Sequence, residues 1–203
     1  MKALILVDLQ NDFCNFGALA VKGGNEVIPI ANALMNKFDL IIATQDWHPA
    51  DHESFAAVHY FRQPGQVINL HGLEQILWPI HCVQETFGAE FVQELDTTKI
   101  TKIFPKGTDK TVDSYSGFFD NGRRGDTGLH DYLQSNNVSE VYIMGLALDY
   151  CVKFTAVDAV ELGYKTHLIV DGTRAVNIQP EDGDNAVDFL RSIGVTIMES
   201  TAL

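Results

Sequence analysis

The feature of this chain that most constrains its fold is a repeated alternation between short apolar runs and stretches of helical spacing. Residues 3–7 and 141–144 are unbroken apolar runs, which are typical of parallel strands buried on both faces of a sheet. Further strands are expected at residues 40–43, 99–104, 166–170 and 195–198. Helical patterns are expected at residues 25–37, 128–134, 152–163 and 180–193, and a short helix also fits residues 87–95. The alternation predicts a single domain over residues 1–203, folded as a three-layer α/β/α sandwich around a mainly parallel, about six-stranded sheet.

Composition narrows the functional classes. The chain of 203 residues is 46% hydrophobic and 20% charged, which is typical of a folded globular protein. Its net charge of −13 argues against binding to nucleic acid or to an anionic membrane surface, because both attract basic proteins. Its three cysteines are an odd number spread along the sequence, so we expect no disulfide framework and a reducing, cytoplasmic location. The sequence shows neither a charged leader nor an apolar run of bilayer length, in agreement with that expectation.

Cys151 is placed where a cysteine could be reactive. It follows the buried strand at residues 141–144 and a turn at Gly145, and we expect it in the first turn of the next helix. The free N–H groups and the positive dipole end of a helix stabilise a thiolate. The alternative is a small buried core residue, the usual environment of a lone cysteine. We favour a nucleophile because other strand ends in this chain carry suitable partners.

Asp8 and Lys106 are those partners. Each lies at or just past the end of a predicted strand, and clefts in open parallel sheets form outside the carboxyl ends of the strands. Lys106 would favour the Cys151 thiolate and depress its pKa, while Asp8 would take the thiol proton and later deliver it to a leaving amine. Taken singly, Asp8 could cap a turn and Lys106 could be a surface charge.

A second group of residues has the composition of a metal site. Asp46 and His48 form a short turn after the second predicted strand, His52 follows four residues later, and His81 ends a long irregular stretch. Carboxylate and imidazole ligands suit zinc, iron or manganese. An Asp-x-His pair is common by chance, and loop histidines usually face solvent. The other four histidines are expected to be structural: His59, His71, His130 and His167.

Several aromatic residues lie in loops near the predicted strand ends. Phe13 and Trp78 could sandwich a flat ring there, although core packing is the default role of Phe13, Trp47, Trp78 and Tyr115.

Five short motifs together resemble a known family. They are DLQNDF at residues 8–13, DWHP at 46–49, WPIHC at 78–82, PKG at 105–107 and GLALDYC at 145–151. In this order, and over nearly the whole chain, they resemble the nicotinamidases of the isochorismatase-like cysteine hydrolase superfamily. Each motif alone is weak, but the five together are specific.

The resemblance implies a role for each matched residue. Cys151 would be the nucleophile, Asp8 the general acid/base and Lys106 the cation that stabilises the thiolate. One divalent metal ion, with zinc expected and iron or manganese as alternatives, would be bound by Asp46, His48 and His81. His52 matches a position that supplies a further ligand in some members.

The resemblance also implies how a substrate would lie. The metal would bind the pyridine nitrogen of nicotinamide, with Phe13 and Trp78 flanking the ring. A cis peptide is expected before Ala147, whose N–H would bind the developing oxyanion together with that of Cys151. Two positions depart from the family pattern: Leu148 replaces a common threonine, and Ile80 replaces a common proline.

The expected activity is hydrolysis of nicotinamide to nicotinate and ammonia through a Cys151 thioester, in a monomer or homodimer that serves NAD salvage. One alternative is another amidase of the superfamily, acting on ureido, carbamoyl or pyrazine amides. An isochorismatase-type vinyl ether hydrolase fits less well, because such members generally lack the cysteine. A non-catalytic α/β module that binds a metal or ligand is the alternative from another class, and it would leave Cys151 with ordinary thiol reactivity.

Overall fold

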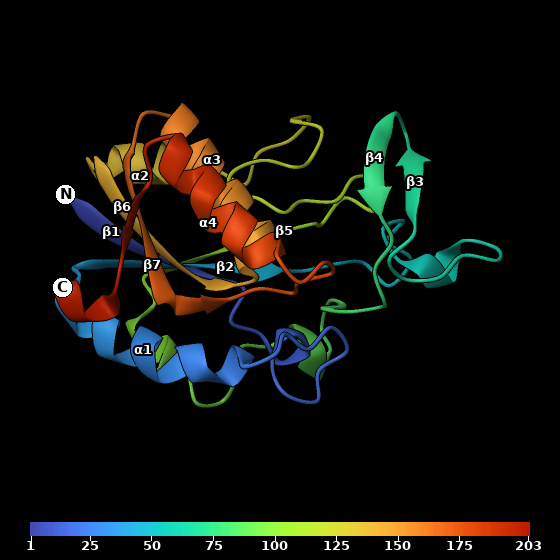
Figure 1. The fold of residues 1–203 in the computed structure, drawn as a ribbon, viewed down its shortest axis with the longest axis horizontal. Coiled ribbons are helices and arrows are strands. Elements are labelled where there is room, and N and C mark those ends of the chain that lie inside the picture. Colours follow the sequence, from blue (N-terminus) through green and yellow to red (C-terminus); the bar gives the residue numbers. More distant parts are fainter.

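The computed structural model describes residues 1–203 and confirms the predicted α/β sandwich (Figure 1). Six strands form a parallel sheet in the order β5–β2–β1–β6–β7–β8. The strands are β1 (Lys2–Val7), β2 (Leu40–Asp46), β5 (Lys102–Lys106), β6 (Glu140–Leu146), β7 (Lys165–Arg174) and β8 (Thr196–Met198). The helices are α1 (Val27–Leu34), α2 (Leu129–Ser135), α3 (Lys153–Glu161) and α4 (Asp182–Ser192).

Helices cover both faces of this sheet. Successive side chains of a strand point to opposite faces, and β1 shows the result: Ala3 and Ile5 join one buried cluster, whereas Leu4 and Leu6 join another. The first cluster includes residues of α2, α3 and α4, and the second includes residues of α1. Figure 1 shows α1 on the side of the sheet opposite to α2, α3 and α4. Burial on both faces explains why the central strands are unbroken apolar runs.

The strand order determines which chain segments meet at one edge. Strand β1 lies between β2 and β6, and β5 lies beyond β2. All of these strands are parallel, so their carboxyl ends face the same edge of the sheet. The residues that follow β1, β2, β5 and β6 therefore lie near one another, although they are far apart in sequence.

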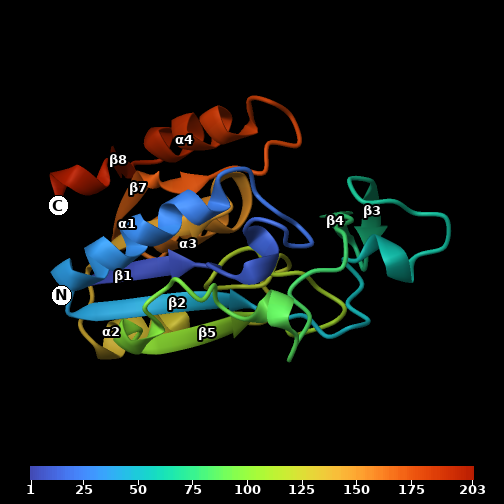
Figure 2. The ribbon, with the colours of Figure 1, turned by 90° about the horizontal axis from the view of Figure 1, so that it is seen from below.

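Two expectations for the connecting segments were wrong. Residues 87–95 do not form a helix, and only Phe87–Ala89 make a single 3₁₀ turn. The stretch after residue 49, expected to be irregular, contains the antiparallel hairpin β3 (Val67–Leu70) and β4 (Leu73–Ile76). His71 and Gly72 form its two-residue turn with φ angles of 50° and 91°, the left-handed geometry that such hairpins favour. The hairpin projects beyond the sheet in Figure 2.

The segment after β6 also differs in detail from the expectation. Leu148–Val152 form a π-helical turn, and the regular helix α3 begins only at Lys153. Cys151 therefore lies in an irregular turn before the helix and not in the first turn of the helix itself. No helix of the chain combines the length and the apolar character needed to span a membrane.

Candidate active site

The four strand-end residues Asp8, Asp46, Lys106 and Cys151 meet at one edge of the sheet. Asp46 ends β2 and is the register partner of Lys106, which ends β5. Asp8 follows β1 directly, and Cys151 follows β6 on the other side of β1. Each of the four is at least nine-tenths buried. The structure thus places the buried ammonium group of Lys106 in contact with two carboxylates, those of Asp8 and Asp46, and with the thiol of Cys151.

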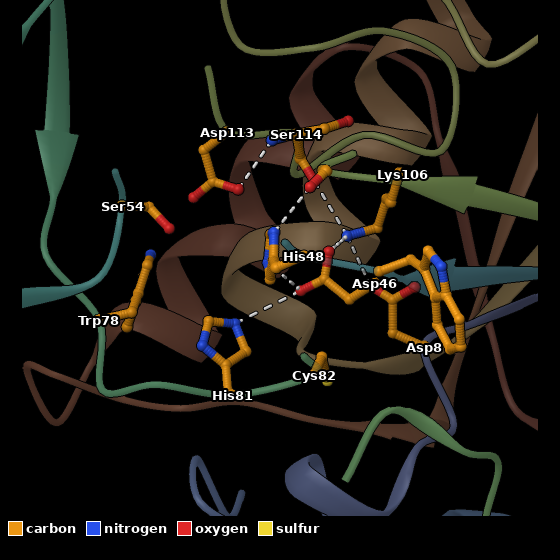
Figure 3. A network of polar contacts seen from close by, with 12 residues as sticks. Asp8, Asp46, His48, Ser54, Trp78, His81, Cys82, Lys106, Asp113 and Ser114 are labelled. Carbon is orange, nitrogen blue, oxygen red and sulfur yellow. Dashed lines mark hydrogen bonds and ion pairs between the residues drawn. The ribbon is translucent and has the colours of Figure 1, made fainter. Parts of the chain in front are cut away.

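Lys106 lies next to both Asp8 and Asp46, as Figure 3 shows. Its Nζ donates to Asp46 Oδ1 at 2.7 Å, to Ser114 O at 2.9 Å and to Cys151 Sγ at 3.4 Å. It also lies 2.8 Å from Asp8 Oδ2. Burial acts to lower the pKa of Lys106, but the carboxylates of Asp46 and Asp8 outweigh it and hold the pKa well above its usual value. The side chain is therefore a permanent buried cation.

The Asp8 carboxyl holds a proton more readily than an exposed carboxyl does. Its Oδ1 accepts a hydrogen bond from Thr44 Oγ1 at 2.6 Å. Its Oδ2 is buried and receives no hydrogen bond of good geometry, although it is within ion-pair distance of Lys106. Burial raises the pKa of Asp8, and Lys106 opposes this only in part. A raised pKa suits a general acid/base.

Cys151 does not have the depressed pKa that its sequence position suggested. Burial raises the pKa of the thiol well above its usual value, and Lys106 lowers it by less. The sign of the Lys106 effect was right, but desolvation is the larger effect because the sulfur lies in a closed site beside two carboxylates. The resting residue is a neutral thiol, so nucleophilic attack requires a base to remove its proton.

Asp46, His48 and His81 converge through three potential ligand atoms (Figure 3). Asp46 Oδ2 lies 3.1 Å from His48 Nε2 and 3.4 Å from His81 Nε2. The other ring nitrogens donate to main-chain carbonyls: His48 Nδ1 to Gly107 O at 2.9 Å, and His81 Nδ1 to Pro79 O at 2.8 Å. Because a carbonyl only accepts, Nδ1 of each ring is the donor, and the Nε2 atoms of both rings are left facing Asp46 Oδ2. This donor set fits a divalent metal ion.

His52 lies beside this cluster with a different orientation. Its ring centroid is 4.3 Å from that of His48, and its nearest possible co-ligands are His48 and Asp113. Its Nδ1 accepts the Ser54 N–H at 3.2 Å and lies 2.7 Å from Ser54 Oγ. The proton of the neutral ring is therefore on Nε2, which is buried and has no partner. Burial, reinforced by His48, lowers the pKa of His52.

A small cavity connects the two groups. Cys151 and Ala147 lie at one part of its wall, and Asp46 and His81 at another. Its remaining lining is mainly aromatic and apolar: Phe13, Leu19, Trp78, Asp113, Tyr115, Tyr150 and Val176. Phe13 packs edge-on against the His81 ring with centroids 5.6 Å apart.

Ala147 lines this cavity and has an unpaired main-chain N–H. The peptide bond between Leu146 and Ala147 is cis, as expected. The Ala147 N–H makes no hydrogen bond within the chain.

Sequence reasoning missed several residues around the cavity. Asp113, Tyr150, Leu19 and Val176 line it, but none of them stands in a pattern that marks a site. Tyr115 was noted only as an aromatic residue, and its hydroxyl accepts from Trp78 Nε1 at 3.0 Å. Four histidines were expected to be structural. Each forms a hydrogen bond to a group outside the cluster of Asp46, His48 and His81: His59, His71, His130 and His167.

Known proteins resemble this chain over nearly its whole length. Residues 2–202 match the isochorismatase domain family. A curated nicotinamidase of Escherichia coli is 50% identical over 202 residues, which cover 97% of this chain and 93% of the relative.

Three solved structures are also similar over nearly the whole chain. An Acinetobacter nicotinamidase superimposes with a TM-score of 0.96 at 39% identity, covering 99% of this chain and 97% of the other. The yeast nicotinamidase bound to the inhibitor nicotinaldehyde gives 0.93 at 37% identity, covering 98% and 100%. A Pyrococcus horikoshii pyrazinamidase in complex with zinc gives 0.79 at 39% identity, covering 98% of each chain.

Proposed function

This chain belongs to the isochorismatase family, and we propose that it hydrolyses nicotinamide to nicotinate and ammonia with Cys151 as the nucleophile. The activity is supported by the nicotinamidases to which the chain is similar over nearly its whole length. The single observation that carries the residue assignment is the position of Lys106. Its ammonium group contacts the thiol, the candidate base and a candidate metal ligand at once.

In the first half of the reaction, Asp8 removes the Cys151 proton as the sulfur attacks the carboxamide carbon. The new C–S bond gives a tetrahedral oxyanion, for which the N–H groups of Ala147 and Cys151 are the proposed donors. Asp8 then returns its proton to the nitrogen, the C–N bond breaks, and ammonia leaves. A nicotinoyl thioester remains on Cys151.

In the second half, Asp8 acts again as a base. It takes a proton from a water molecule whose oxygen attacks the thioester carbon. The C–S bond breaks, nicotinate forms, and the proton passes back to the sulfur. Lys106 lies 3.4 Å from that sulfur and favours its anionic form whenever the thiolate is the leaving group or the attacking group.

Asp46, His48 and His81 would hold one divalent metal ion, and we propose His52 as a further ligand through Nε2, which requires its proton to be on Nδ1, facing Ser54 Oγ. Zinc is the proposed ion, because a similar pyrazinamidase was solved with zinc, while iron and manganese accept the same donors. When bound, the ion supplies a positive charge that anchors the pyridine nitrogen. Phe13 and Trp78 would flank the ring and hold it between the ion and Cys151.

The wider context follows from this activity. We propose a single-domain cytoplasmic enzyme, monomeric or homodimeric, that returns nicotinamide toward NAD. With a net charge of −13, a small molecule is a more suitable partner than a nucleic acid or an anionic membrane.

Ammonia release from a panel of amides tests the proposal. Purified protein should release ammonia from nicotinamide, with pyrazine carboxamide as an acceptable analogue because it keeps a ring nitrogen in the same place. Benzamide lacks that nitrogen and should be a poor substrate. Equal rates with benzamide and nicotinamide would contradict the role of the ring nitrogen, and activity only on ureido or carbamoyl compounds would contradict the assigned substrate.

A further inference from the structure

The side chain of Gln10 is fully buried, and all of its amide hydrogens are used. Its Nε2 donates to the main-chain oxygen of Asp46 at 2.7 Å and to that of Ala89 at 2.9 Å. Its Oε1 accepts the main-chain N–H of Asp46 at 2.8 Å. The partners fix the orientation of the amide, because a carbonyl can only accept and an N–H can only donate.

The two hydrogen bonds between Gln10 and the main chain of Asp46 take the place of strand pairing that β1 no longer provides there. The parallel pairing of β1 with β2 runs only as far as Leu6 opposite Ala43, and the chain then turns at Asp8 with a φ of 49°. On its other side, β2 remains paired with β5 through Asp46 and Lys106. Asp46 would therefore have an unpaired N–H and C=O on the side of β1. The Gln10 amide satisfies both, as a neighbouring strand would.

The position of the Asp46 main chain matters because both oxygens of its carboxylate have separate partners. Oδ1 binds Lys106 at 2.7 Å, while Oδ2 faces His48 at 3.1 Å and His81 at 3.4 Å. Metal–ligand distances tolerate only about 0.2 Å of error. A main chain that is free on one side could not hold the carboxylate in both places.

We propose that Gln10 is a positioning residue, which fixes the main chain of Asp46 so that its carboxylate can bind the metal. This inference rests on the metal site of the proposed function, and it assigns Gln10 no contact with substrate or metal. The prediction is that loss of the Gln10 amide weakens metal binding in protein that is still folded.

Gln45 provides a matched control. Its Nε2 donates to the same Ala89 oxygen at 2.9 Å, but it makes no hydrogen bond to the main chain of Asp46. Gln10→Ala and Gln45→Ala both remove a glutamine that binds Ala89 O, and only the first removes the contacts to Asp46. A general loss of packing near Ala89 would affect both variants.

The experiment measures zinc affinity by competition with a chromophoric chelator, after the native metal has been removed, in samples shown to be folded by circular dichroism. Gln10→Ala should raise the zinc Kd by about 10- to 100-fold, the usual effect of losing a group that orients a ligand. Gln45→Ala should stay within about twofold of the wild type, a margin well below that effect.

A zinc Kd of Gln10→Ala within the same margin, or an equal loss in both variants, would overturn the proposal. If Gln10→Ala does not fold, Gln10→Met is measured instead. It keeps a side chain of similar length but has neither an acceptor for the Asp46 N–H nor a donor for Asp46 O, so the same loss of affinity is expected. The wild-type protein is measured first. If it binds no zinc, the metal site itself is contradicted before any variant is compared. The measurement uses no substrate, so it is independent of whether nicotinamide is hydrolysed.

Discussion

The ammonium nitrogen of Lys106 lies 3.4 Å from the sulfur of Cys151, and both side chains are closed off from solvent. The same nitrogen binds the carboxylate of Asp46. One cation thus connects the proposed nucleophile to a proposed metal ligand. Buried charges are strongly coupled because little solvent screens them, so a change at one group should be felt at the other.

Replacing Lys106 with methionine should damage both stability and activity. The change leaves the carboxylates of Asp8 and Asp46 buried without their cation, which costs about 3–5 kcal/mol of unfolding free energy. Activity on nicotinamide should fall by about 100-fold or more. Urea unfolding and ammonia release measure the two effects. Lys110→Met is the control, because Lys110 pairs with Asp51 in solvent and should show no measurable change. Equal stability losses in the two variants would refute the buried-cation account.

Alkylation of Cys151 should be slow near neutral pH. Burial raises the pKa of the thiol, so the reactive thiolate is scarce at pH 7 and increases as the pH rises. Lys106→Met removes the group that lowers this pKa, so labelling should become slower still. The rate is followed with iodoacetamide in a Cys14→Ala, Cys82→Ala background, where only Cys151 remains. Labelling of this protein that is as fast at pH 6 as at pH 9 would show that the thiolate predominates at rest.

Gly107 should tolerate no side chain. A Cβ at this position would lie 2.4 Å from His48 Cε1, and the backbone has a φ of +64°. Gly107→Ala should therefore displace the His48 ring and abolish metal binding, in addition to the cost of about 1–2 kcal/mol for the left-handed backbone. Gly128→Ala has a similar φ of +81° but meets no atom within 4 Å, so only the backbone cost is expected. Thermal unfolding and metal content distinguish the two. Full metal occupancy in Gly107→Ala would contradict the assigned position of His48.

His52 and His48 should differ in their importance for the metal. Nε2 of His48 lies 3.1 Å from Asp46 Oδ2, whereas Nδ1 of His52 accepts from the Ser54 N–H and Nε2 of His52 has no partner. We expect His48→Ala to lose bound metal and His52→Ala to keep most of it with a lower affinity. Metal content after gel filtration is the measurement. His71→Ala, in an exposed pair with Glu53, should be unaffected. Complete metal loss in His52→Ala would make His52 an essential ligand.

Much of this site could be predicted because polar residues at the ends of apolar runs are easy to recognise. Asp8 follows the buried strand β1, Lys106 ends the edge strand β5, and the parallel sheet places the carboxyl ends of both strands at the same edge. The sequence alone could not supply the pKa of Cys151. That value depends on how much of the sulfur is desolvated and on two carboxylates that approach from β1 and β2.

Contacts between segments far apart in the sequence could not be predicted either. Gln10 binds Asp46 and Ala89, which are 36 and 79 residues away, and although it stands in the DLQNDF motif, nothing in the motif shows what its side chain contacts. The hairpin β3–β4 was missed because its short strands carry exposed polar residues, so neither has the apolar run of a core strand. The direction of the His48 ring depends on the carbonyl of Gly107, which another strand brings into place.

The central claim is that Cys151 is the nucleophile, and the rate of ammonia release from nicotinamide by Cys151→Ala tests it most directly. Cys14→Ala, which also removes a buried thiol, is the control, and circular dichroism shows whether each variant is folded. We predict that folded Cys151→Ala loses at least about 10⁴-fold in rate, the scale seen when a covalent nucleophile is removed, while Cys14→Ala stays near the wild type. A folded Cys151→Ala variant that keeps a tenth or more of the wild-type rate would contradict the thioester mechanism.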